Sequence, residues 1–243
     1  MPYIQETCRA GRTIEVRKYR SWRWGVRGSR EPWSAPTPEA QQRVNEAQAE
    51  TKLRRLLNAN FETGDYHLVL TYRKGEAPTP EEAKERLAAA IRKMRGAYRD
   101  EGNPLKYISV TEYRKARIHH HLIVPKTDLK LLTECWEWGR IHVNPLDESG
   151  QWGKLASYLV KETKSCGGKR WNESRNLTRP EIKKEVIHRN WTRKPRPPAG
   201  YELDGEPVEG IHEVTGAEYQ YYICVKKRSQ EHGKCKGLRN LRE

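Results

Sequence analysis

Three consecutive histidines, His119, His120 and His121, lie between Ile118 and the apolar run 122–124. The segment predicts a β-strand, in which alternate side chains point to the same face. His119 and His121 therefore share one face, while His120 shares the other with its apolar neighbours. Two imidazoles held two residues apart on a rigid strand can bind one divalent cation. The spacing predicts a metal site held by His119 and His121.

A second group of reactive side chains lies in the segment 151–164, which predicts a helix. Tyr158 has Lys154 one turn before it and Lys161 one turn after it. The apolar side chains gather on another side, as expected for a face packed on a sheet. A nearby ammonium favours the phenolate form of a tyrosine, whose ordinary pKa is about 10. A metal site followed by such a helix predicts phosphoryl transfer on DNA, with Tyr158 and Lys161 as the catalytic residues.

The charge balance indicates a polyanionic partner. The 243-residue chain carries 47 Lys and Arg against 32 Asp and Glu, which gives a net charge of +15. Such an excess is typical of nucleic-acid-binding proteins, whose cationic side chains contact phosphates. We expect Arg114, Arg117, Lys154 and Lys164, which flank the two reactive segments, to bind the nucleic acid.

Several other classes of protein are disfavoured by what the chain lacks. Its five cysteines are scattered without a C-x-x-C pair, which argues against a disulfide framework and a structural zinc site. No apolar run is long enough to cross a membrane and no signal peptide is recognisable, so we expect a soluble, cytoplasmic protein without a membrane partner. A P-loop is also missing, so we expect the protein to depend on a host helicase.

The order of the expected elements predicts an α+β fold. Thr79, Pro80 and Glu82 mark the start of the first helix of the middle part. Strands are expected over 66–72, 106–111, 117–124 and 140–144, and helices over 80–98, 129–136 and 151–164. This order is that of an antiparallel sheet with helices packed on one face.

The chain divides into three parts. Residues 1–60 form an N-terminal extension with a strand over 13–19 and a helix, which Thr37 caps and Pro38 opens. Residues 61–166 form the domain that carries the histidines and the tyrosine. Residues 167–243 form a basic C-terminal region.

The C-terminal region is expected to be mostly irregular. The Pro- and Arg-rich run 193–198 predicts an extended linker. Residues 219–225 predict one late strand. The end of the chain, 226–243, carries seven Lys or Arg against two Glu, which predicts a disordered basic tail.

Three motifs of the middle part occur in the order and spacing of a known superfamily. The first is the apolar strand 68–72 with its Thr71, the second is His119-x-His121 preceded by Arg117, and the third is Tyr158-x-x-Lys161. Over about residues 65–165 the chain resembles the HUH endonucleases, in particular the rolling-circle replication initiators of the filamentous-phage gene II protein type and of small plasmids. One position departs from the pattern, since His120 stands where the family prefers a bulky apolar residue.

The resemblance implies a nicking and joining enzyme with a ferredoxin-like endonuclease domain over 61–166. Tyr158 would cut one strand of an origin by metal-dependent transesterification, which leaves a 5′-phosphotyrosine link and a free 3′-hydroxyl for rolling-circle replication, with later strand rejoining. The implied cofactor is Mn²⁺ or Mg²⁺. The implied partners are single-stranded or extruded origin DNA and the host helicase and polymerase.

The resemblance also implies an acidic metal ligand shortly before the histidines, for which Glu112 is the candidate. Strand parity opposes this choice, because a three-residue turn at 114–116 pairs Thr111 with His119. Only a longer loop or a β-bulge would place the Glu112 side chain on the same face as His119 and His121. His67 on the neighbouring strand, or water, is the alternative third ligand.

Two other functions stay open. A transposase or relaxase would use the same chemistry, and a non-catalytic basic protein on the same fold would bind DNA even when metal is removed. Termination of a replication round is a further question, because the helix carries a single tyrosine and a second acceptor is needed. Water activated by Glu162, or Tyr158 of a second subunit, would serve.

Overall fold

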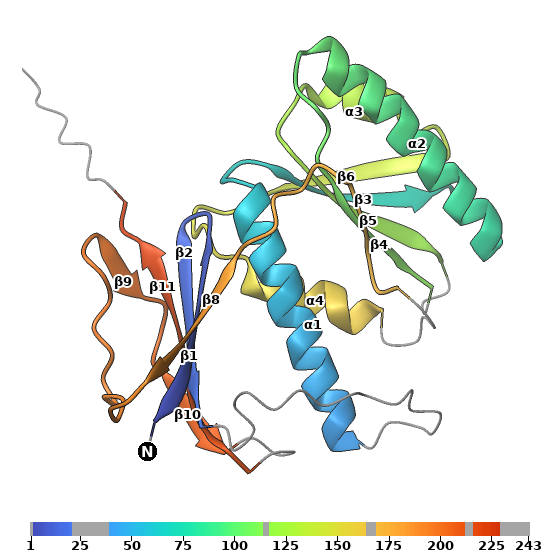
Figure 1. Ribbon diagram of the computed structural model, residues 1–243. Coiled ribbons are helices and arrows are strands. Elements are labelled where there is room, and N and C mark those ends of the chain that lie inside the picture. The colour runs from blue at the N-terminus through green and yellow to red at the C-terminus, as the bar shows by residue number, and fades with distance from the viewer. Residues whose placement is uncertain (1, 21–38, 114–116, 164–168, 212–215, 229–243) are drawn as a thin grey trace, which may run out of the picture.

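Two antiparallel sheets and four helices make up the part of the chain that the computed structural model describes (Figure 1). That part comprises residues 2–20, 39–113, 117–163, 169–211 and 216–228. All strand pairs described are antiparallel, which confirms the predicted α+β class. The predicted features at Thr37, Pro38, the turn 114–116 and the tail from residue 229 onward lie outside these described residues.

The strands of the middle part form one sheet, called the histidine sheet, in the order β6-β3-β5-β4-β7. Its strands are β3 (Tyr66–Tyr72), β4 (Ile108–Glu112), β5 (His119–Val124), β6 (Gly139–Pro145) and β7 (Asn172–Glu173). The first four agree with the predicted strands to within two residues. Because β5 lies between β3 and β4, the histidines stand in the middle of the sheet and can meet side chains from both neighbours.

Helices cover both faces of the histidine sheet, whereas the sequence predicted one. The four helices are α1 (Glu39–Asn60), α2 (Pro80–Asp100), α3 (Leu129–Glu134) and α4 (Gly153–Glu162). α2 and α3 bury one face, which includes Leu68 and Leu122. α1 and α4 bury the other face, which includes Ile108 and Ile123 (Figure 1). The one-face prediction is wrong because β5 is apolar on both faces beyond the histidines, so each face needs its own cover.

The helix α2 begins where its sequence signals predicted. The Thr79 hydroxyl accepts a hydrogen bond from the Glu82 backbone N–H at 3.2 Å, and the Thr79 N–H donates to the Glu82 carboxylate at 2.9 Å. This reciprocal pair satisfies two backbone donors that the first turn leaves open. Within the described residues, none of the helices has the length and apolar character needed to span a membrane.

The two ends of the described chain meet in a second sheet, called the terminal sheet, with the order β10-β11-β2-β1-β8 and with β9 beside β11. Its strands are β1 (Tyr3–Ala10), β2 (Thr13–Tyr19), β8 (Ile182–Ile187), β9 (Tyr201–Leu203), β10 (Val208–Ile211) and β11 (Glu218–Lys226). The predicted strand 13–19 and the predicted late strand are present as β2 and β11, and they pair with each other. The sequence assigned them to separate parts of the chain.

The strand β1 was absent from the sequence prediction, although the turn that follows it carries a hairpin signal. Gly11 and Arg12 connect β1 to β2, and Gly11 has a φ of +54°. A Cβ atom at Gly11 would lie 1.9 Å from the backbone oxygen of Asn58 in α1. Glycine at this turn therefore allows the hairpin to pack against the end of α1.

The run 193–198, predicted as an extended linker, is packed against the terminal sheet. Pro195 is buried. The side-chain amide of Gln220 in β11 donates to the backbone oxygens of Thr192 at 2.9 Å and Arg193 at 3.2 Å. The linker prediction is wrong because a Pro- and Arg-rich composition does not reveal that a distant strand supplies a partner for its backbone.

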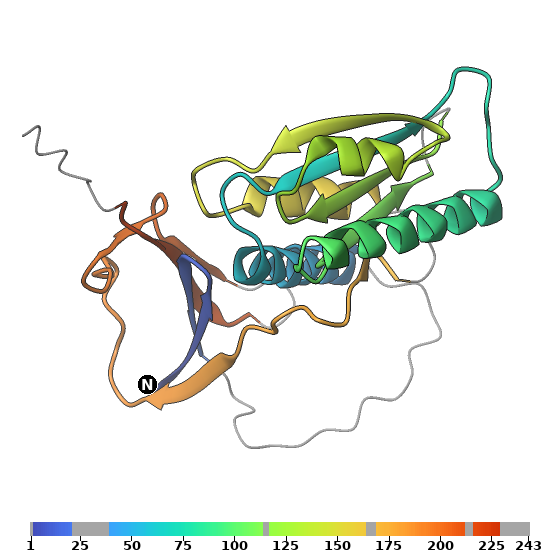
Figure 2. The same cartoon turned by 90° about the horizontal axis from the view of Figure 1, so that it is seen from above.

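A buried carboxylate joins the terminal sheet to α1. Glu15 of β2 is fully buried, and its two oxygens accept hydrogen bonds from Arg54 at 2.7 Å and Arg55 at 2.6 Å. Arg54 also donates to the Tyr221 hydroxyl of β11 at 2.6 Å. These charged donors offset the cost of burying the carboxylate. The same helix that covers the histidine sheet is thereby attached to the terminal sheet (Figure 2).

Replacing Glu15 with Gln should lower the free energy of unfolding by about 3–5 kcal/mol, because two partly buried guanidinium groups lose their countercharge. The matched control is Glu185→Gln, which removes one partner of the exposed pair with Lys183 and should cost less than about 1 kcal/mol. Urea denaturation followed by circular dichroism measures both variants. Equal losses in the two variants would contradict the prediction.

Candidate metal centre and tyrosine site

The three histidines alternate across the histidine sheet as the strand period predicts. His120 is buried on the face under α2 and α3, where its ring nitrogens lie 2.9 Å from the Tyr72 hydroxyl and 2.9 Å from the Thr111 hydroxyl. Its ring also meets Trp136 edge-on, with centroids 5.7 Å apart. His119 and His121 point to the opposite face. His120 therefore fills the position of a bulky apolar side chain and satisfies two hydroxyl groups.

Glu112 lies on the same face as His119 and His121 because of the β4–β5 register. Glu112 pairs directly with His119, and Thr111 pairs with His120. The connection over 113–118 is longer than the three-residue turn that would have paired Thr111 with His119, so the parity objection to Glu112 does not hold. Glu112 Oε2 lies 2.7 Å from His119 Nε2 and 3.8 Å from His121 Nε2.

The three side chains form a compact donor cluster. One ligand atom from each of Glu112, His119 and His121 lies within 4.8 Å of the other two. Burial is the main cause that lowers the pKa of His121 to about 4, with His67 and His119 lowering it further and Glu112 opposing them. The ring is therefore neutral at pH 7 and keeps a lone pair. Among the described residues, the buried His121 Nε2 has no hydrogen-bond partner.

These observations fit a divalent cation between the three side chains. An orphaned buried nitrogen that faces a carboxylate and a second imidazole gains a partner when a cation binds. Two nitrogen donors and one oxygen donor suit Mn²⁺ by ligand type, and Mg²⁺ is also compatible with the carboxylate.

A second contact orients each of the two imidazoles. His119 Nδ1 lies 3.2 Å from the backbone oxygen of Arg117, which can only accept a hydrogen bond. His121 Nδ1 lies 3.1 Å from His67 Nε2. His67 therefore meets His121 at the ring nitrogen that points away from the cluster, and the structure does not bring it in as the alternative third ligand.

The helix α4 brings Tyr158 next to this cluster. The Tyr158 ring meets the His121 ring edge-on, with centroids 5.4 Å apart and an interplanar angle of 89°. The tyrosine stays 40% exposed. The buried side of α4 consists of Ala156, Leu159 and Val160, and Trp152 just before the helix is also buried. Asn58 of α1 accepts a hydrogen bond from the Trp152 backbone N–H at 3.1 Å, so a residue from outside the helix holds its start.

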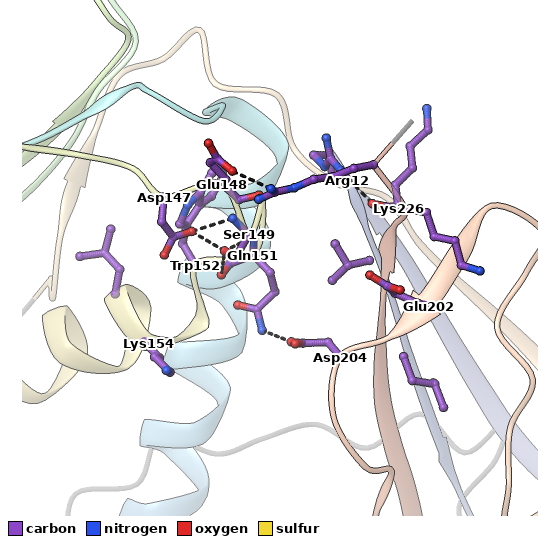
Figure 3. Close-up of a pocket in the computed structure, with 15 residues that line it drawn as sticks. Arg12, Asp147, Glu148, Ser149, Gln151, Trp152, Lys154, Glu202, Asp204 and Lys226 are labelled. Atoms are coloured by element: carbon purple, nitrogen blue, oxygen red, sulfur yellow. Dashed lines mark hydrogen bonds and ion pairs between the residues drawn. The ribbon is translucent and has the colours of Figure 1, made fainter. Parts of the chain in front are cut away.

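The basic residues predicted to act at the site or to bind nucleic acid do not all lie beside the donor cluster. Lys161 is exposed on α4, and Arg117 is exposed just before β5. Lys154 lines a cavity of about 800 Å³ between the start of α4 and the terminal sheet, together with Arg12, Lys226 and acidic side chains (Figure 3). Neither Tyr158 nor the donor cluster lines that cavity. Arg114, Lys164 and the side chain of Glu162 lie outside the described residues.

One basic residue near the cluster was not singled out from the sequence. The registers of the histidine sheet place Arg140, Thr71, His119 and Glu112 in a row on one face. Arg140 is exposed on the edge strand β6. In the sequence, Arg140 lies beside Ile141 and Val143, two apolar residues that alternate with polar ones, and this pattern indicates a strand with one polar face. Only the β3–β6 pairing shows that Arg140 shares the face of the donor cluster.

Replacing His120 with Leu should leave the affinity for Mn²⁺ unchanged, because His120 points away from the donor cluster. The same change should lower the free energy of unfolding by about 1–3 kcal/mol, since the buried Tyr72 hydroxyl loses a partner. Isothermal titration calorimetry measures the first quantity and urea denaturation the second. His121→Leu is the matched comparison and should abolish Mn²⁺ binding; loss of binding in His120→Leu alone would contradict the assignment.

Comparison with known proteins agrees with the motifs and the geometry. No curated protein and no solved structure shows significant similarity to the chain. Residues 65–163 match the family described as Replication-associated protein ORF2/G2P, which is of the rolling-circle replication initiator type. The matched segment contains β3, the histidine strand, the donor cluster and the tyrosine helix. Over these residues the chain is similar to the Replication-associated protein ORF2/G2P family.

Proposed function

We propose that this protein initiates rolling-circle replication by nicking one strand of an origin, with Tyr158 as the nucleophile. The observation that carries the proposal is the contact of Tyr158 with His121, which is itself part of the donor cluster. A tyrosine that packs on a metal ligand is within reach of a phosphate bound at the same place. The match of residues 65–163 to a replication-associated family supports the same conclusion.

Glu112, His119 and His121 would hold the divalent cation. When bound, Mn²⁺ or Mg²⁺ supplies Lewis-acid polarisation of the scissile phosphate and stabilises the negative charge that develops there. The protein contributes a fixed set of donors, because the rigid β4–β5 pairing places two of them opposite each other.

The side chains on α4 would carry out the covalent step. The Tyr158 oxygen forms a bond to phosphorus, the bond from phosphorus to the 3′-oxygen breaks, and that oxygen takes up a proton to become a free 3′-hydroxyl. The phenol proton must leave, and Lys161 one turn away provides positive charge that favours the phenolate. The phosphodiester energy is kept in the phosphotyrosine link, so rejoining needs no nucleotide cofactor.

The exposed face beside the cluster would receive the DNA strand. Arg140 and Thr71 continue the row of His119 and Glu112 toward the edge of the sheet, and Arg117 stands just before β5. Cationic side chains at these positions can contact the phosphates on either side of the scissile one. The substrate is single-stranded or extruded origin DNA, since a metal site on a sheet face needs a strand that can bend to it. A host helicase and polymerase would then use the free 3′-hydroxyl.

Tyr158→Phe should abolish the covalent protein–DNA adduct, because the ring contact with His121 is kept and only the attacking oxygen is lost. The assay incubates the protein with a labelled single strand from the element's own origin and Mn²⁺, and the adduct is resolved on a denaturing gel. Tyr113→Phe, which changes another exposed tyrosine, is the matched control and should form the adduct. EDTA should prevent the adduct in the unchanged protein.

Other outcomes of this assay identify the rival functions. An adduct that persists in Tyr158→Phe would show that another tyrosine is the nucleophile. Tight, EDTA-resistant DNA binding without any adduct would favour a non-catalytic DNA-binding protein. Transfer of the bound strand to an unrelated DNA end would favour a transposase.

Arg117→Ala should weaken binding of single-stranded DNA and make it less dependent on salt. Loss of one phosphate contact reduces the slope of log affinity against log salt by about 0.7. Fluorescence anisotropy at several salt concentrations measures that slope. Arg92 is exposed on α2, which covers the opposite face of the sheet, so Arg92→Ala should leave the slope as it is in the unchanged protein. The same slope in Arg117→Ala and Arg92→Ala would argue that the DNA does not pass beside β5.

A further inference from the structure

His67 and His121 form a pair of stacked rings on the face of the histidine sheet that α1 and α4 cover. Val69 lies directly opposite His121 in the β3–β5 pairing, so His67 is the diagonal neighbour of His121 on the same face. Their ring centroids are 5.3 Å apart with an interplanar angle of 29°, and His67 Nε2 lies 3.1 Å from His121 Nδ1. This distance is that of a hydrogen bond between the two nitrogens.

The proton in this contact can sit on either ring. A neutral imidazole carries a single proton, on one of its two ring nitrogens. In one arrangement His121 Nδ1–H donates to His67 Nε2, and His121 Nε2 keeps a lone pair. In the other arrangement His67 Nε2–H donates, and the proton of His121 must sit on Nε2.

The surroundings of His121 Nε2 distinguish the two arrangements. This atom is buried and has no hydrogen-bond partner among the described residues, and Glu112 Oε2 is too far from it, at 3.8 Å, for a hydrogen bond. A proton there would be a buried donor without an acceptor, which costs about 1–3 kcal/mol. A lone pair there faces the centre of the donor cluster, where it can bind a cation.

His119 provides an internal comparison. Its Nδ1 faces the backbone oxygen of Arg117, an obligatory acceptor, and its Nε2 lies 2.7 Å from Glu112 Oε2 in the cluster. At His121 the corresponding acceptor is the side chain of His67. The two imidazoles of the cluster are thus oriented by different kinds of group, and only the second can be removed by a substitution.

We propose that His67 is a positioning residue that accepts the Nδ1 proton of His121 and thereby keeps His121 Nε2 available to the cation. The inference rests on the metal site of the proposed function. His67 acts through His121 and is not itself a ligand, because its Nε2 lies against the nitrogen that points away from the cluster. Partners of this kind typically contribute 10- to 100-fold, roughly, to metal affinity.

The first experiment measures the dissociation constant for Mn²⁺ in the 243-residue protein by isothermal titration calorimetry. His67→Phe keeps a flat stacking ring and removes the acceptor, so it should weaken binding by about 10- to 100-fold. His67→Gln places an amide oxygen near the former Nε2 and should recover most of that loss. His188→Phe, which changes an exposed histidine of the C-terminal region, is the matched control and should bind as the unchanged protein does.

The second experiment needs no metal. Long-range proton–nitrogen NMR spectra of histidine-labelled, metal-free protein report which nitrogen of His121 carries the proton. The unchanged protein and His67→Gln should show the proton on Nδ1, and His67→Phe should shift it to Nε2. A merely structural role for the His67 ring predicts no difference between Phe and the unchanged protein in either measurement.

The outcomes separate this inference from the proposed function. Equal Mn²⁺ affinity in His67→Phe and the unchanged protein would overturn the positioning role, as would a proton on His121 Nε2 in the unchanged protein. Absence of Mn²⁺ binding in the unchanged protein would overturn the metal site of the proposed function, and the NMR spectra alone would then decide whether His67 holds the His121 proton.

Discussion

The registration of β5 between β3 and β4 is the constraint on which the candidate site depends. With Glu112 opposite His119, the carboxylate and two imidazoles meet on one face. Because side chains alternate along a strand, a slip of one residue would turn His119 and His121 into the α2–α3 core and bring His120 to the face that carries Glu112. The contacts of His120 with Tyr72 and Thr111 oppose that slip, since they would be lost from the buried side.

Apolar packing around this strand explains how a tyrosine on a separate helix comes to lie on His121. The sheet face beyond the histidines is buried by α1 and α4, and Ile123 belongs to the same cluster as Leu159. The apolar stripe of α4 is therefore held on β5, and the helical period leaves Tyr158 at the border between buried and exposed surface. The ring contact between Tyr158 and His121 occurs at that border.

The terminal sheet extends this packing through α1. One side of α1 contributes Leu53 and Leu57 to the cluster beneath the histidine sheet, and Arg54 and Arg55 bind Glu15 of β2. Asn58 near the end of the same helix holds the start of α4. Strands drawn from both ends of the described chain are thus connected to the tyrosine helix through one element, although they contribute no side chain to the donor cluster.

Local periodicity in the sequence determined which side chains could act together: the strand period put His119 and His121 on one face, and the helix period kept Tyr158 and Lys161 off the apolar stripe. It also located the middle strands and the start of α2 at Thr79. The tertiary structure decided the partner of His119 on β4, the contact of His67 with His121 and the union of β2 with β11. Each of these depends on pairing between residues that are separated along the chain, and the free energy of such a pairing comes from both partners, so no local pattern encodes it.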